Sequence, residues 1–467
     1  MMHSLPRLCV TLFALLAGAL VNSATAQAEQ LPISMMYSNS SIMGLPFDLI
    51  SKGRWQPNPA ARFVKLHLYF DHPVKLSSFE VIPCDKPFEH DITVFANFDE
   101  WLWKLDSNAE MPEPLDSGRA ANKVKGTVDA DASIRSLTFN FEQNKGFALC
   151  GIKLYDPAKK PLDLVVPRII PGTADASSTL APASAYSVMN LFDSRFESAW
   201  SSDKIASNVS LNFNFTEQQS ITRLRIWGGY QRSPEHCIAN SRPKLLRIDG
   251  ENGYSVKINV KDVMGAQEIA LPKPYSGKSL KITVEDSYHG KSYADLLISE
   301  LRFGDSNGWF MLDPLPHIRE GILANRQKFH DANLAAVLDD SLMHTDGESS
   351  DLYDRLRLRS DGSFYLSGMN GGVEAPPLNY FAIGSYEIKA VDPVKGMQLR
   401  LFGLYHESEA YGDCNGCGRD CNRPEAEKEK IFQELVWLKP DDTGKKFTFT
   451  PFSGKRIAKK AINFALE

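Results

Sequence analysis

Three cysteines lie close together near the C-terminal end of the chain, and their spacing is compatible with two kinds of chemistry. Cys414, Cys417 and Cys421 fall within the Gly- and Asp-rich segment YGDCNGCGRDCNRP. Three thiolates with His406 as a fourth ligand could hold zinc. In an oxidising compartment disulfides are favoured instead, and Cys237 could pair with the odd member. Four cysteines allow three pairings, and the sequence does not choose among them.

Two further cysteines stand in strand-like segments nearer the N-terminus. Cys84 ends the segment FEVIPC, and Cys150 lies within GFALCGIKLY. Both segments belong to the same predicted β module, and export would place them in an oxidising compartment. We therefore predict a Cys84–Cys150 disulfide.

Compact catalytic motifs are missing from the sequence. There is no G-x-S-x-G elbow and no H-E-x-x-H zinc motif. Carboxylates gather after a predicted helix, at Asp339, Asp340, Glu348, Asp351 and Asp354. A glycosidase needs two carboxylates facing each other across a cleft, and this spacing does not specify such a pair. We predict a protein without enzymatic activity, catalytic residues or cofactor, with a hydrolase site in the C-terminal domain as the weaker alternative.

Short alternating segments dominate the chain from about residue 33 to residue 303. They are rich in β-branched and aromatic residues and are separated by Gly, Pro, Asn and Asp, which is typical of antiparallel sandwiches and barrels. Examples are VKLHLYF, KLSSFEVI, RSLTFNF, VSLNFNF, ITRLRIW, SVKINV and SLKITV. The fold class predicted is therefore mainly β.

An internal repeat divides this β-rich region into two modules. Phe47-Asp48 matches Phe192-Asp193, and Trp55 matches Trp200 at the same offset in the chain. The strand LHLYF matches LNFNF at that offset as well, so duplication is a better explanation than chance. We predict a first sandwich over residues 29–160, a linker over 161–182 and a second sandwich over 183–305.

The rest of the chain is predicted to form a helical connector and a separate β domain. Residues 306–345 contain one helical pattern, REGILANRQKFHDANLAAVLDD. Residues 346–467 return to strands, beginning with a hairpin signal at Ser360-Asp361-Gly362. The pattern predicts a small up-and-down barrel or half-barrel of lipocalin-like appearance. Such a domain could engage a partner or a small ligand.

The N-terminus has the features of an export signal. Arg7 precedes the apolar segment LCVTLFALLAGAL, and small residues follow at Ala24-Thr25-Ala26. We predict a signal peptide over residues 1–28, no transmembrane segment after its removal, and a periplasmic, secreted or cell-surface bacterial protein. The net charge of -5 gives no reason to expect nucleic acid as a partner.

The second module carries a recognisable order of motifs. It reads ASAYSVMNLFDSRFESAW, then ITRLRIWGGYQRS, ANSRPKLLRI and a closing segment that ends in ISELRF. This resembles the discoidin-like jelly roll named for its occurrence in streptococcal NAD glycohydrolase, and the first module resembles a degenerate relative. The resemblance implies two tandem jelly rolls that attach to glycans without catalysis. It also allows a structural calcium near Asp193, although Ser194 stands where the family usually has Gly.

A sugar site needs a flat aromatic surface and a few planar polar groups, which the loops at one end of a sandwich can supply. The candidates, near His236, are Trp227, Tyr230, Arg232, Asn240 and Arg242. The leading hypothesis is an exported binding protein that recognises a carbohydrate or a cell-envelope polymer, with a protein partner also conceivable. The alternative is an envelope assembly scaffold, in which Trp227 and Tyr230 would be buried.

Overall fold

The structure is a computed structural model. It describes residues 29–59, 61, 64–97, 114–120, 122–129, 131–142, 144–196, 198–204, 207–339, 343–345, 354–370, 378–392, 394–409, 428–442, 446–451 and 462–466. The predicted signal peptide and the cluster of Cys414, Cys417 and Cys421 lie outside the described residues. Within the described part, no helix is long and apolar enough to cross a bilayer.

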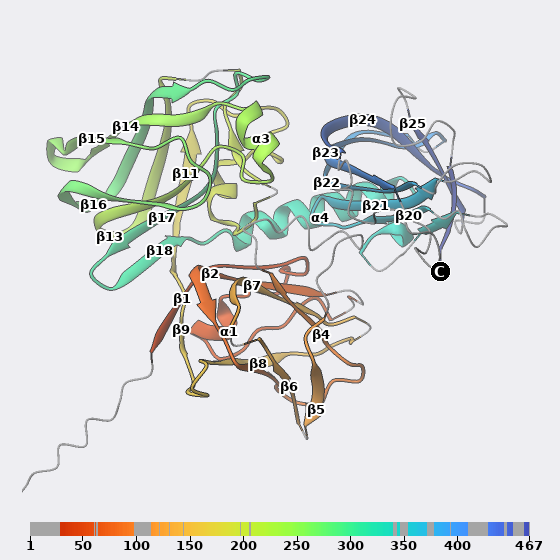
Figure 1. The fold of residues 1–467 in the computed structure, drawn as a ribbon. Helices are drawn as coiled ribbons and strands as arrows, with labels where there is room; N and C mark the ends of the chain where they lie inside the picture. The colour runs from red at the N-terminus through yellow and green to blue at the C-terminus, as the bar shows by residue number, and fades with distance from the viewer. Residues whose placement is uncertain are drawn as a thin grey trace, which may run out of the picture.

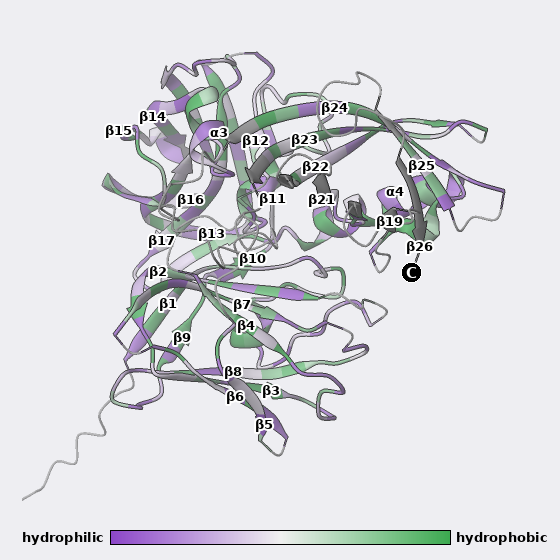
Figure 2. Cartoon of the chain, turned by 45° about the vertical axis from the view of Figure 1, so that its right-hand side comes forward, coloured by the Kyte–Doolittle hydropathy of each residue, from purple (hydrophilic) through white to green (hydrophobic). Residues whose placement is uncertain are grey.

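The first module is a sandwich of two antiparallel sheets, one of which carries a short parallel strand at its edge. One sheet has the order β4 (Thr93–Asn97), β7 (Ser133–Asn140), β2 (Lys65–Lys75), β1 (Gln30–Ser38) and β9 (Asp163–Val165). The other has the order β5 (Ser117–Ala120), β6 (Lys123–Thr127), β3 (Ser78–Pro83) and β8 (Leu149–Tyr155). Figure 2 shows hydrophobic and hydrophilic positions alternating along many of these strands, as expected when one face of each sheet is buried.

The second module is a sandwich in which two long strands run through both layers. Its main order is β10 (Arg168–Ile170), β18 (Gly308–Leu312), β17 (Leu297–Asp305), β13 (Val209–Gly228), β16 (Gln267–Tyr288), β14 (Arg242–Gly250) and β15 (Ser255–Asn259). The register between β13 and β16 shifts between Asn214 and Gln219. Such irregularities bend a strand, which lets β13 continue from one layer to the next.

The duplicated positions occupy equivalent surroundings in the two sandwiches. Trp55 forms a bridge with Leu149 of β8, and Trp200 in β12 (Trp200–Ser201) pairs with Ile298 of β17. Both indoles are buried, and each indole N–H donates to a backbone carbonyl at 3.2 Å. In both modules the paired strand is the last long strand of the sandwich, as duplication predicts.

The predicted disulfide is present. Cys84 and Cys150 are bonded, with a Cα–Cα distance of 4.8 Å, so β8 is tied to the chain that leaves β3. Cys237 is a buried free thiol in the short helix α3 (Pro234–Ala239).

The predicted linker does more than connect the sandwiches. Its residues form β9 at the edge of the first sandwich and β10 in the second. They also form β11 (Gly172–Ala176), which pairs with β13. Three short strands of this segment therefore extend the sheets of both sandwiches.

A helix and a closed barrel follow the second sandwich. Helix α4 (Leu315–Asp331) leads to eight strands in sequential order: β19 (Met343–Thr345), β20 (Asp354–Leu358), β21 (Ser363–Asn370), β22 (Leu378–Asp392), β23 (Gly396–Glu409), β24 (Lys428–Pro440), β25 (Lys446–Pro451) and β26 (Ile462–Leu466). Pairing of β19 with β26 closes the barrel, so the up-and-down prediction is confirmed.

Helix α4 contacts all three β domains. Figure 1 shows it running between the second sandwich and the barrel, above the first sandwich. Phe329 near its C-terminal end joins the hydrophobic core of the barrel. Near its N-terminal end, Arg319 donates to the carbonyl oxygens of Ile42 and Met43 in the first sandwich. The helix therefore positions the side chains of a junction between the three domains.

A cavity at the junction of the second sandwich, helix and barrel

The five predicted ligand-binding residues do not converge on one surface. Trp227, at the end of β13, is 3 % exposed and packs with Met35 and Tyr69 of the first sandwich. The guanidinium of Arg302 lies 5.8 Å from the centre of its indole. Trp227 thus contributes to the interface between the two sandwiches, where it lines a smaller pocket together with Phe196 and Gln231.

Tyr230 and Arg232 face the barrel instead. The Arg232 guanidinium stacks on the Tyr230 ring at 4.9 Å, and its Nη2 donates to Ser385 Oγ at 2.7 Å. Its Nη1 donates to the carbonyl oxygen of Phe402 at 3.3 Å. Ser385 and Phe402 lie on β22 and β23, so Arg232 joins the second sandwich to the outer wall of the barrel.

Asn240 and Arg242 hold the end of helix α3. Asn240 Nδ2 donates to the carbonyl oxygen of His236 at 2.7 Å. Arg242 donates to the carbonyl oxygens of Cys237 and Asn240, and its guanidinium pairs with Asp262. These contacts fix the local backbone of the loop between β13 and β14.

The largest cavity we describe lies where the second sandwich, α4 and the barrel meet. About 1090 Å³ of space lies between its walls, open solvent included, and the walls are both polar and aromatic. The second sandwich contributes Asn190, Asp193, Arg195, Ser198 and Tyr230; α4 contributes His317, Gly321, Asn325 and Lys328; and the barrel contributes Ser385, Tyr386, Glu387 and Phe402. Of the predicted ligand-binding residues, Tyr230 is the one that lines this cavity.

The Asp193 loop forms one wall of the cavity and holds its carboxylate within a hydrogen-bond network. Ser198 Oγ donates to Asp193 Oδ2 at 2.5 Å, and the backbone N–H of Arg195 donates to Asp193 Oδ1 at 2.9 Å. The same N–H lies 2.9 Å from Glu300 Oε1. Burial and the nearby Glu300 raise the pKa of Asp193 well above its ordinary value.

A buried guanidinium occupies the place that a structural calcium near Asp193 would need. Arg302 Nη1 donates to Glu300 Oε2 at 2.7 Å and to the carbonyl oxygen of Leu191 at 3.1 Å. Its Nη2 donates to Ser194 Oγ at 3.0 Å. These are the hard oxygen ligands that calcium prefers, but an internal cation already binds them. The residues around Asp193 therefore do not fit a calcium ion.

Among the described residues, no group of three or more His, Cys, Asp or Glu side chains is arranged to hold a metal ion.

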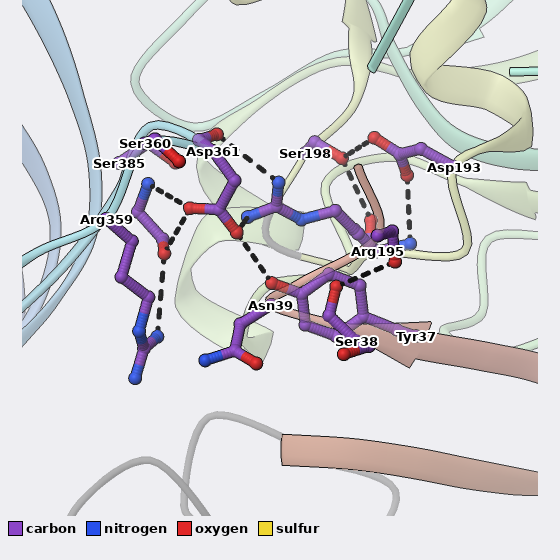
Figure 3. Close-up of polar contacts among 12 residues, drawn as sticks. Tyr37, Ser38, Asn39, Asp193, Arg195, Ser198, Arg359, Ser360, Asp361 and Ser385 are labelled. Atoms are coloured by element: carbon purple, nitrogen blue, oxygen red, sulfur yellow. Dashed lines mark hydrogen bonds and ion pairs between the residues drawn. The ribbon is translucent and has the colours of Figure 1, made fainter. Parts of the chain in front are cut away.

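Asp361 brings the barrel into contact with both sandwiches. It lies in the predicted hairpin turn between β20 and β21, and Tyr37 of the first sandwich donates to its Oδ2 at 2.9 Å. Arg195 of the second sandwich lies 3.4 Å from the same oxygen, and its guanidinium stacks on the Tyr37 ring (Figure 3). Burial alone would raise the pKa of Asp361, but Arg195, Arg359 and hydrogen bonds from Ser363 outweigh it and lower the pKa.

One face of α4 forms the second wall of the cavity. His317, Gly321, Asn325 and Lys328 recur at helical spacing, so their side chains lie on one side of the helix. Asn325 Nδ2 donates to the carbonyl oxygen of Ser360 at 3.0 Å. Burial lowers the pKa of His317, which favours its neutral form.

The α4 residues of this cavity were not foreseen from the sequence. The helical pattern predicted α4, but nothing in it indicates which polar face meets a neighbouring domain. The hairpin signal at Ser360-Asp361-Gly362 was visible, yet its insertion between two sandwiches depends on tertiary packing.

A family model for the NAD glycohydrolase translocation F5/8 type C domain matches residues 169–304. No curated protein matches the chain.

Several solved structures are similar at low identity. A family 32 carbohydrate-binding module of Clostridium perfringens NanJ, solved with galactose, is 19% identical, with 28% of this chain and 92% of that chain covered and a TM-score of 0.22. The CBM32-1 and CBM32-2 domains of Clostridium perfringens ZmpB, solved with GalNAc, are 12% identical, with 58% and 89% covered and a TM-score of 0.22. A fucolectin from striped bass (Morone saxatilis) serum is 11% identical, with 60% and 96% covered and a TM-score of 0.22.

The family match covers most of the second sandwich, from β10 to β17. It includes the Asp193 loop and the Tyr230–Arg232 segment that line or border the cavity. Residues 169–304 of this chain are therefore a domain of the NAD glycohydrolase translocation F5/8 type C family.

Proposed function

We propose that the protein binds carbohydrate in the cavity between its F5/8 type C domain, helix α4 and the barrel. The observation that carries this proposal is the composition of the cavity wall. Hydroxyl, amide and charged side chains line it beside the rings of Tyr230 and Phe402. Sugars are bound by this combination, because hydroxyl groups need polar partners and the ring faces need apolar surface.

The place of the cavity supports the same proposal. It lies at the loop end of the sandwich, where such folds commonly place their binding residues.

The carboxylates that line the cavity support binding rather than catalysis. Asp361 is paired with Arg195, and Glu387 is paired with Arg400 and Lys389. Asp193 accepts hydrogen bonds from its own loop. A glycosidase needs one carboxylic acid and one carboxylate free to reach the substrate. The hydrolase alternative is tested by including a reducing-sugar assay with the binding measurements.

An assembly scaffold remains the second candidate, because Trp227 and Tyr230 are both buried. Under this alternative the junction has a structural purpose and the cavity has no saccharide ligand. Either function would operate outside the cytoplasm, which is consistent with a disulfide between Cys84 and Cys150. We propose a periplasmic, secreted or surface location, with a glycan or cell-envelope polymer as the partner.

Gly321 offers a test that leaves the fold intact. It lines the cavity on α4, and a Cβ atom at this position would meet no other atom within 4 Å. We expect the full-length protein to bind saccharides on a glycan array, and Gly321→Phe to abolish this binding by filling the cavity.

Gly321→Ala is the matched control, because it adds only a methyl group and should leave binding unchanged. Isothermal titration of each hit against the three proteins gives the affinities. Absence of binding by the folded full-length protein across a broad array would favour the scaffold. Equal binding by Gly321→Phe would place the saccharide elsewhere.

A further inference from the structure

We infer that the junction cavity selects saccharides that carry a carboxylate, such as oligouronates. This inference rests on the proposed function and specifies its ligand class. It follows from the charges of the described residues around the cavity, among which the Lys328 ammonium has no ion-pair partner and the carboxylates lie beside cations or within a hydrogen-bond network.

The anionic side chains of the wall have internal partners. The Glu387 carboxylate lies between Arg400 and Lys389, with Lys389 Nζ 2.8 Å from its Oε2. Asp361 accepts from Tyr37 and pairs with Arg195. A ligand anion entering the cavity therefore meets carboxylates whose charge is largely balanced by adjacent cations.

Asp193 adds little further repulsion. It lies beside Glu300 in a desolvated network that disfavours a second negative charge, and the buried Arg302 balances Glu300. The wall formed by the second sandwich is thus close to electrically neutral.

Lys328 supplies a positive charge that these pairs do not use. Its side chain lines the cavity from the last turns of α4, and it forms no ion pair with any residue the structure describes. Asn325, one turn earlier on the same face, is held by the Ser360 carbonyl and presents an amide beside it. A primary ammonium next to an amide can bind a carboxylate by charge-assisted hydrogen bonds.

A structural role for Lys328 would look different. A cation near the C-terminal end of a helix stabilises the helix slightly through the helix dipole. That role predicts a small change in thermal stability on substitution and no change in ligand preference, so the two roles can be separated.

The test compares an oligouronate with its fully methyl-esterified form, which keeps the sugar rings and removes the negative charge. Trigalacturonate, triglucuronate and trimannuronate are titrated calorimetrically into the full-length protein, each beside its ester. We expect at least one acid to bind about tenfold more tightly than its ester, the effect of one charge-assisted contact. A sulfated trisaccharide is included, because a sulfate ester offers the same negative charge in another geometry.

Three variants identify the residue responsible. Lys328→Gln should reduce the preference for the acid to about onefold to twofold, whereas Lys328→Arg should keep most of it. Lys291→Gln, at an exposed position on the loop between β16 and β17, should behave like the wild type.

The outcomes separate the inference from the proposed function. Equal binding of acid and ester, preference for the sulfated sugar over every uronate, or an unchanged preference in Lys328→Gln overturns the inference. In those cases neutral or sulfated saccharides still bind, and the proposed function stands. Failure of every saccharide to bind the folded protein rejects both.

Discussion

Arg302 connects several buried polar groups of the F5/8 type C domain. Its side chain is fully buried, and it connects Glu300 with the Leu191 carbonyl and the Ser194 hydroxyl. The Glu300 carboxylate would therefore be left buried and unpaired if the guanidinium were removed.

We expect Arg302→Met to lower the free energy of unfolding by about 3–5 kcal/mol, the usual cost of removing one partner of a buried pair. Chemical denaturation measures this change. Lys244→Met, which breaks an exposed pair with Asp286, is the control and should cost less than about 1 kcal/mol. Comparable losses in the two variants would contradict the role given to Arg302. We also expect that neither calcium nor a chelator changes the free energy of unfolding of the wild type. The reason is that Arg302 already binds the oxygen atoms near Asp193 that calcium would use.

Asp193 makes the stability of this domain depend on pH in a definite direction. Its pKa is higher in the folded chain than the ordinary value of 3.8, so folding favours its protonated form. The contribution of Asp193 to the free energy of unfolding is therefore greatest at low pH. It decreases as the pH rises from 3.8 toward the pKa of the folded state.

Asp193→Asn removes this titration while keeping a polar side chain of similar shape. As the pH rises above about 4, we expect the wild type to lose unfolding free energy relative to the variant. Denaturant titrations at several pH values give both curves. Curves that stay parallel throughout would show that folding does not raise the pKa of Asp193.

Among the elements, the sandwich strands were the most predictable from sequence. Their alternation of apolar and polar residues follows directly from a sheet with one buried face, and the Phe-Asp and Trp positions aligned the two modules. The predicted linker was harder to interpret, because β9, β10 and β11 are short edge strands whose pairing depends on partners far along the chain.

The site was less predictable than the fold. Tyr230 lines the cavity, whereas Trp227 and Arg232 lie at domain interfaces. An aromatic ring at the end of a strand looks the same in sequence whether it faces solvent or another domain. The sequence does not show which face of α4 lines the cavity. The role of Asn325 and Lys328 became visible only from the position of the helix between the domains.

The Cys84–Cys150 bond is the main covalent constraint that we describe in the first sandwich. It closes a loop with a sequence separation of 66 residues. Loops of this length restrict the unfolded chain enough for a stabilisation of about 4 kcal/mol in the loop-entropy model.

Replacing both cysteines by Ala should lower the free energy of unfolding by about 2–5 kcal/mol. Thermal unfolding of the double variant and of the reduced wild type should show similar losses. A double variant as stable as the oxidised wild type would mean that the disulfide does not stabilise the fold.

At the scale of the whole molecule, the junction around Asp361 connects both sandwiches with the barrel. The carboxylate contacts Tyr37 from one sandwich and Arg195 from the other. Loss of this side chain would leave Arg195 partly buried without its acidic partner.

We expect Asp361→Ala to loosen the barrel from the sandwiches, which should increase the radius of gyration measured by small-angle scattering and split the thermal transition. Asp392→Ala is the matched control, because Asp392 caps the exposed turn between β22 and β23 and lies away from the junction. An unchanged scattering profile in Asp361→Ala would show that the remaining contacts suffice to hold the domains together.

The sharing of one cavity by three parts of the chain limits what can be learned from fragments. An excised F5/8 type C domain would keep Tyr230 and the Asp193 loop but lose the walls that α4 and the barrel provide. Under the proposed function, such a fragment would fold and yet fail to bind the saccharide. Transfer of this sandwich to another protein would then carry over its fold and not the proposed binding.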